Sequence, residues 1–110
     1  MTMLLTLSSD QSATGAQTPI HLNTTPFQGG WDKNAFLVID GAIGDGVVEI
    51  QGNPLIQDQA PASDDPNWTT IATLNSSSPT EQEIELPQWI MANVTTAGAT
   101  ACNINLRGVQ

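Results

Sequence analysis

Residues 81–94 read EQEIELPQWIMANV, and this stretch indicates the fold. On each side of Pro87 an apolar residue recurs at every second position. These residues are Ile84 and Leu86 before the proline, and Ile90, Ala92 and Val94 after it. Before the proline, Glu83 and Glu85 occupy the intervening positions, so one face is apolar and the other acidic. A period of two is typical of a β-strand with one face on a core and the other in water.

Similar segments follow one another along the whole chain. Thr, Ile and Val predominate in them, which suits a pleated surface, and seven Pro and nine Gly separate them. No window keeps the apolar spacing of a helix. The expected strands are 3–7, 18–23, 36–39, 47–51, 68–74, 81–86, 90–94 and 102–107. We therefore predict an all-β fold, an antiparallel β-sandwich or jelly roll of about eight short strands.

In three of these segments the pattern also predicts which side chains point into the core. The run FLVI at 36–39 is apolar at every position, which predicts a central strand covered on both sides. In 18–23 the alternation directs Ile20 and Leu22 inward and His21 outward. In 102–107 it directs Cys102 into the core, where a small apolar Cys is common.

The 110 residues amount to one domain, which we place at 1–110. Residues 1–35 are less regular than the rest, and we expect them to serve as an extended N-terminal arm that packs on a neighbour. Connections are expected at 8–17, 23–34 and 52–67. Loops of more than about 12 residues are uncommon and often functional.

Charge narrows the functional classes. Eleven acidic residues stand against Lys33 and Arg107, a net charge of −9. Binding to nucleic acid or to an anionic membrane needs clustered cations, so both are disfavoured. No run approaches the 18 or so apolar residues of a membrane span, and residues 1–7 lack the basic start of a signal peptide. We expect synthesis in a cytoplasm.

Catalytic and metal-binding patterns are sparse. The chain has one His and one Cys, His21 and Cys102, and the alternation places them on opposite faces. The carboxylate pairs 83/85 and 64/65 fit a solvated strand face and a loop better than a glycosidase cleft. The acidic loop 58–65 has no EF-hand spacing. We predict a non-enzymatic protein with no cofactor and no metal.

The aromatic residues indicate contacts more than chemistry. Trp68 begins a strand and is expected in the core, whereas the pattern does not decide which face of its strand Trp89 occupies. Trp31 lies in a Gly-rich loop with Phe27 close by. Tryptophan rings anchor protein interfaces or stack on sugars when exposed. The loop with Phe27 and Trp31 is the candidate for a partner contact.

The region 36–108 resembles a group of small phage virion proteins. The matching features are the alternating strand 47–51, a variable acidic loop, NWTTI at 67–71, an alternating strand before Pro87, ANVTTAGAT at 92–100, and a closing strand that ends with Leu106, Arg107 and Gly108. Proteins of this group are β-sandwiches encoded among head and tail genes, and some decorate or cement the capsid.

The resemblance implies a capsid decoration or cement protein on the outer surface of the phage head. Its partner would be the major capsid protein, and the chain would form a homo-oligomer, with a trimer at a three-fold position as one form. The expected contact residues are Met3, Leu5, Leu7, Phe27 and Trp31. Two alternatives stay open: a tail, baseplate or head-fibre-base protein, and a carbohydrate-binding module that uses exposed Trp. An enzyme is a third and weaker one.

Overall fold

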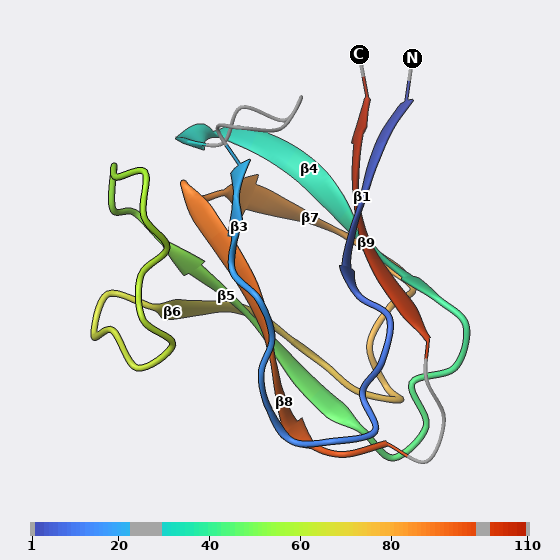
Figure 1. Cartoon of the computed structure of the whole chain (residues 1–110). Coiled ribbons are helices and arrows are strands. Elements are labelled where there is room, and N and C mark those ends of the chain that lie inside the picture. The colour runs from blue at the N-terminus through green and yellow to red at the C-terminus, as the bar shows by residue number, and fades with distance from the viewer. Residues whose placement is uncertain (1, 23–29, 99–101, 110) are drawn as a thin grey trace.

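The computed structural model describes residues 2–22, 30–98 and 102–109, and side chains at 4–22, 34–98 and 102–108 (Figure 1). Nine strands make up most of this part of the chain. They are β1 (Thr2–Ser8), β2 (Gly15–Ala16), β3 (Ile20–His21), β4 (Gly30–Asp40), β5 (Val47–Asn53), β6 (Thr69–Leu74), β7 (Glu81–Leu86), β8 (Trp89–Thr96) and β9 (Asn103–Val109).

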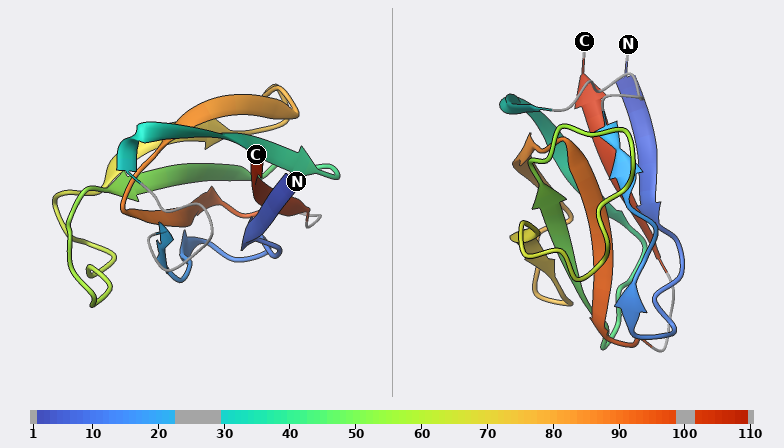
Figure 2. Two further views of the ribbon diagram at one scale, coloured as in Figure 1. Left: turned by 90° about the horizontal axis from the view of Figure 1, so that it is seen from above. Right: turned by 60° about the vertical axis from the view of Figure 1, so that its left-hand side comes forward.

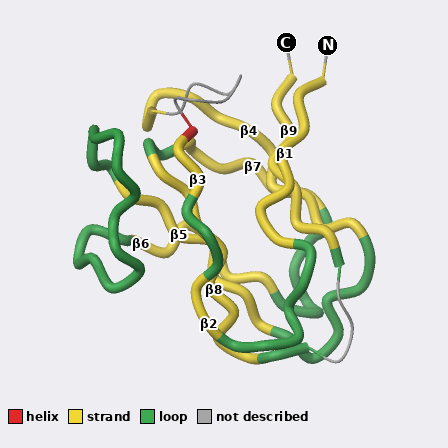
Figure 3. The backbone as a smooth tube through the Cα atoms, viewed as in Figure 1, coloured by secondary structure: helices red, strands yellow, loops and turns green. Residues whose placement is uncertain are grey.

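The strands form two antiparallel sheets. The first has the order β1-β9-β4-β7, and the second the order β2-β8-β5-β6, with β3 also paired to β8. Figure 2 shows the two layers facing each other, and Figure 3 shows the loops gathered at their ends and edges. The predicted antiparallel β-sandwich is therefore confirmed. The structure has one strand more than the eight predicted, because the expected connection 8–17 contains the two-residue strand β2.

The core lies between the sheets and is built from the residues that alternation directs inward. Strands β5, β8 and β9 contribute side chains that are 0–1% exposed: Val48, Ile50, Ile90, Ala92, Val94, Ile104 and Leu106. Strand β7 adds Ile84 and Leu86, and Cys102 is buried beside β9. The inward assignments for these strands are confirmed because a period of two sends each set to one face.

Strand β4 differs from the prediction. It is central in its sheet, between β9 and β7, but only one face is covered. Leu37 and Ile39 are buried, whereas Phe36 and Val38 are half-exposed. Instead of a second layer, the Arg107 guanidinium lies over the Phe36 ring, 5.2 Å from its centre, and pairs with Glu81 of β7. The guanidinium of one arginine thus covers part of an apolar position that the sequence suggested was buried.

Strand β1 pairs along its length with β9 of the same chain. Thr2 lies opposite Val109 and Thr6 opposite Asn105, and the register shifts between Thr6 and Ser8. Residues 2–8 are thus part of the chain's own first sheet. That residues 1–35 also pack on a neighbour stays a prediction.

A buried glutamine closes the connection after β1. Gln11 is fully buried. Its Nε2 donates to Ser8 Oγ at 2.8 Å and to the Cys102 carbonyl at 3.0 Å, and its Oε1 accepts from the Cys102 amide at 2.9 Å. The backbone carbonyl of Gln11 accepts from the Gly98 amide at 2.9 Å. One side chain therefore satisfies both backbone groups of Cys102 and fastens residues 8–11 to the start of β9.

We expect Gln11→Ala to lower the free energy of unfolding by about 3 kcal/mol, because it leaves the buried amide and carbonyl of Cys102 unpaired. Gln17→Ala is the matched control. The side-chain amide of Gln17 donates one exposed hydrogen bond, to the Asp10 backbone carbonyl. Removing it should therefore lower the free energy of unfolding by less than about 1 kcal/mol. Urea unfolding of the two variants measures both values, and equal costs would contradict the role assigned to Gln11.

Candidate interaction surface

The predicted contact residues fall in different environments. Leu7 is only 6% exposed and belongs to the core, and Leu5 packs half-buried against it. The structure thus uses these two side chains for the chain's own packing. Among the β1 side chains that the structure describes, residues 4–8, the exposed apolar one is Leu4, at 64%, on the opposite face. The predicted loop 23–34 is wrong for Trp31, because the backbone of Trp31 lies in β4. The side chains of Met3 and Trp31, and all of Phe27, lie outside the described part of the chain.

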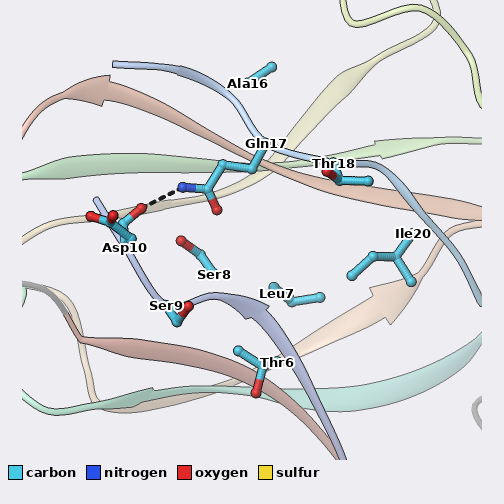
Figure 4. Close-up of a pocket in the computed structure, with 9 residues that line it drawn as sticks. All are labelled: Thr6, Leu7, Ser8, Ser9, Asp10, Ala16, Gln17, Thr18 and Ile20. Atoms are coloured by element: carbon cyan, nitrogen blue, oxygen red, sulfur yellow. Dashed lines mark hydrogen bonds between the residues drawn. The ribbon is translucent and has the colours of Figure 1, made fainter. Parts of the chain in front are cut away.

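A groove opens between the β1 edge of the first sheet and the β2–β3 edge of the second. It measures about 510 Å³ and runs between the end of β1, the following connection and β3 (Figure 4). Its lining residues are Thr6, Leu7, Ser8, Ser9, Asp10, Ala16, Gln17, Thr18 and Ile20. Leu7 and Ile20 supply apolar surface, and hydroxyl and amide groups supply most of the rest.

Asp10 is the one carboxylate among these lining residues. Its Oδ1 accepts hydrogen bonds from the Ser12 hydroxyl at 2.6 Å and the Ser12 amide at 2.9 Å. These bonds hold the pKa of the Asp10 carboxyl below its ordinary value. The carboxylate is thus ionised at neutral pH, and none of the other described residues that line the groove is a titratable group able to form an acid–base pair with it.

The long connection between β5 and β6 forms a second, more prominent surface. Residues 54–68 project away from both sheets in Figure 1 and in the left view of Figure 2. Ile56, in this loop, is 85% exposed, the highest value among the large apolar side chains of the described residues. Neither the exposure of Ile56 nor its anchoring was foreseen from the sequence, which indicated only that the loop is long.

Buried polar groups hold this loop in one shape. Asn53, fully buried at the end of β5, accepts from the Leu55 amide at 3.0 Å and donates to Asp65 at 3.4 Å. Asp65 Oδ1 also accepts from the Asn67 amide at 2.8 Å. The indole of Trp68 donates to the Ala62 carbonyl at 2.8 Å. The loop is thus preorganised, which reduces the entropy lost when it binds.

Trp68 differs from the expectation, and Trp89, whose face the sequence left undecided, is buried. Trp68 is half-buried and bonds to its own loop, outside the main core cluster. Trp89 is 5% exposed and stacks on His21, with ring centres 4.3 Å apart and planes 6° from parallel. His21 is half-buried rather than an exposed strand residue, because it lies directly opposite Trp89 in the β3–β8 register. A sugar-stacking platform needs exposed rings, and these two indoles do not form one.

Catalytic and metal-binding groups do not converge in the described residues. No three His, Cys, Asp or Glu side chains at 4–22, 34–98 and 102–108 gather as metal ligands. Glu83 and Glu85 lie on the exposed face of β7. Burial raises the pKa of the Cys102 thiol above its ordinary value of 9.0, and the negative charge of Asp40 adds to the effect. A thiol of this kind is a poor nucleophile at neutral pH.

Comparison of the chain with protein-family models, with curated proteins and with solved structures finds no match in any of the three. Within the described ranges, no helix has the length and apolar character needed to cross a membrane. The surfaces above therefore carry the functional argument.

We expect Asn53→Ala to loosen residues 54–68. It removes the acceptor of the Leu55 amide and a partner of Asp65, and we expect a cost of about 1–3 kcal/mol in the free energy of unfolding. Hydrogen exchange should become faster at the Leu55 amide. Asn67→Ala, at an exposed position in the same loop, should leave that exchange unchanged. Unaltered protection in Asn53→Ala would show that the loop is held by other contacts.

The Cys102 thiol should react slowly in the native protein, at least about tenfold slower with a disulfide reagent than in urea, because it is buried and protonated. Its raised pKa also predicts a pH dependence. The unfolded chain ionises the thiol first, so the stabilisation is present below about pH 9 and is lost as the pH rises through the folded value. Unfolding measured across this range should show less alkaline loss in Cys102→Ala than in the parent.

Proposed function

We propose that this chain is a non-enzymatic structural protein of a phage virion, a decoration or cement protein that binds the outer surface of the head shell and stabilises it. The proposal combines the resemblance of residues 36–108 to small phage virion proteins with the surfaces described above. That region corresponds to β4–β9 with the long acidic loop between β5 and β6, so the resemblance covers most of the sandwich.

The observation that carries the proposal is the anchored loop 54–68 with Ile56 at 85% exposure. A large apolar side chain on a loop held by Asn53, Asp65 and Trp68 suits insertion into a pocket of a partner. Fully desolvated anchors of this kind contribute most of the energy of many interfaces. A cement protein needs such an anchor on a rigid body, and it needs no reactive group.

Charge adds a requirement on the partner. The chain has a net charge of −9, and Asp58, Asp64 and Asp65 belong to the same loop as Ile56. We therefore expect the receiving surface to be apolar at its centre and neutral or basic at its rim, since opposite charges favour encounter and like charges oppose it. Modest single contacts suffice because a shell offers many equivalent sites to oligomeric copies.

Co-sedimentation with purified capsids that lack this protein tests the proposal. We expect saturable binding at a fixed ratio to the major capsid protein and a higher melting temperature of the shell. Ile56→Ser should weaken binding at least about tenfold, since a large apolar side chain contributes about 1.5–3 kcal/mol when fully buried. Gln59→Ser, at an exposed polar position of the same loop, should bind like the parent.

Capsids that neither bind the protein nor gain stability would contradict the head assignment. Binding to isolated tails or baseplates would then favour the other virion role. Quenching of tryptophan fluorescence by glycans would favour a carbohydrate-binding module. Equal binding of the Ile56→Ser and Gln59→Ser proteins would leave the head assignment standing and remove the loop from the interface.

A further inference from the structure

The four sheet edges differ in how well they are protected against pairing with another chain. β7 carries Glu81, Glu83 and Glu85, which repel a second acidic strand. The β2–β3 edge consists of two strands of two residues with Pro19 between them. β6 is uncharged, but its side chains are Thr, a half-buried Ile71 and small or buried residues. Among the edges formed by the described strands, the edge of β1 is the one without such protection.

β1 has the features of an edge that pairs. It is seven residues long, TMLLTLS, with no charged side chain and no proline. β9 lies on one side of it, and no other described strand pairs with the other side. No described strand pairs with the alternate N–H and C=O groups on that side, so they are available to extend the sheet. Leu4, on the face away from the core, is 64% exposed.

The regular part of this edge has its centre at the exposed leucine. Pairing with β9 runs without interruption from Thr2 to Thr6, and the register shifts only after Thr6. The middle of these five positions is Leu4. An antiparallel pairing of two copies about an axis at Leu4 places Thr2 of one copy opposite Thr6 of the other. It also places the two Leu4 side chains against each other on the outer face of the first sheet.

The symmetry of this segment about Leu4, together with the lack of acidic side chains in it, favours a second copy as the occupant. All eleven acidic residues lie outside β1 and β9, so two copies of this −9 chain can meet at this edge without facing carboxylates. The nearest side chains on the same face are neutral or cationic. Thr6 donates to Asn105 at 2.9 Å, and Arg107, which lies opposite Leu4 in the register, is already paired with Glu81.

We propose that two copies of this chain associate through β1, antiparallel about a two-fold axis at Leu4, so that the two four-stranded sheets join into one eight-stranded sheet. The Leu4 side chains become buried against each other at the seam. This isologous contact is closed, because each copy uses its one free β1 edge. The inference goes beyond the proposed function and concerns the free protein, so capsid binding neither supports nor removes it.

Sedimentation of the purified full chain over a concentration series tests the stoichiometry. We expect the mass to rise from 11.6 kDa to twice that value. Leu4→Glu should keep the monomer mass, because it places two carboxylates face to face at the axis. In the monomer the new carboxylate lies opposite Arg107, so the fold should be retained, as urea unfolding will show. The matched control is Thr70→Glu, at an exposed position of the β6 edge, which should dimerise like the parent.

Disulfide trapping tests the register without relying on the stability of the dimer. In the proposed dimer, Leu4→Cys places the two introduced cysteines directly opposite each other. Their Cα atoms would lie about 4.5–5.5 Å apart, which is within the range that a disulfide spans. Oxidation should give a covalent dimer. Thr6→Cys is the control, because the two copies of position 6 would lie about 14 Å apart. The parent should not cross-link, since Cys102 is buried.

A parent that stays monomeric up to about 1 mM, or that forms a trimer, overturns the proposal. So does a Leu4→Glu protein that is folded and dimerises like the parent. Cross-linking of Thr6→Cys in place of Leu4→Cys would overturn the register and with it the axis at Leu4.

Discussion

The packing of alternate side chains between two facing sheets is the constraint on which the structure depends. Ile50 and Ile90 from the second sheet and Ile104 and Leu106 from the first are all 0% exposed. Each fully buried side chain of this size contributes about 1.5–3 kcal/mol of transfer free energy. Because β7 supplies one side chain in two to this core, its outer face is left to the residues between them, which include Glu83 and Glu85. The acidic face of β7 and the apolar inner layer are thus two results of one period.

The buried apolar layer also requires polar side chains that pair with backbone groups at its border. Once the sheets are packed, the segments that leave them at the border of the core carry backbone groups into regions with little water. Gln11 satisfies the amide and carbonyl of Cys102 where the chain leaves the first sheet. Asn53 does the same for the Leu55 amide where the long loop leaves the second. Two buried amide side chains therefore fix two connections, and the groove beside β1 and the projecting loop both take their shape from them.

The sequence predicted the elements governed by period two and missed those governed by single contacts. The inward residues of β5, β7, β8 and β9 follow from their spacing alone, since a shift of one residue would turn each set outward. Gln11 and Asn53 could not be singled out, because a buried amide in a small polar segment has the composition of an exposed one. The half-exposed outer face of β4 depends on Arg107, which is distant in the sequence. His21 became half-buried because its register partner is Trp89, and register is not readable from one strand.

The two exposed apolar residues of the described chain have different physical settings, and this difference bears on how the protein would act on a shell. Leu4 lies on a sheet edge where backbone groups are free, which favours another strand. Ile56 lies on an anchored loop with no free strand edge, which favours a pocket. Figure 1 places β1 and the loop on opposite sides of the molecule. A pairing through β1 would therefore leave both loops free, and one dimer would present two anchors. Release from a surface would then require both to detach, so weak single contacts would give durable attachment where the spacing of sites on the shell matches the dimer.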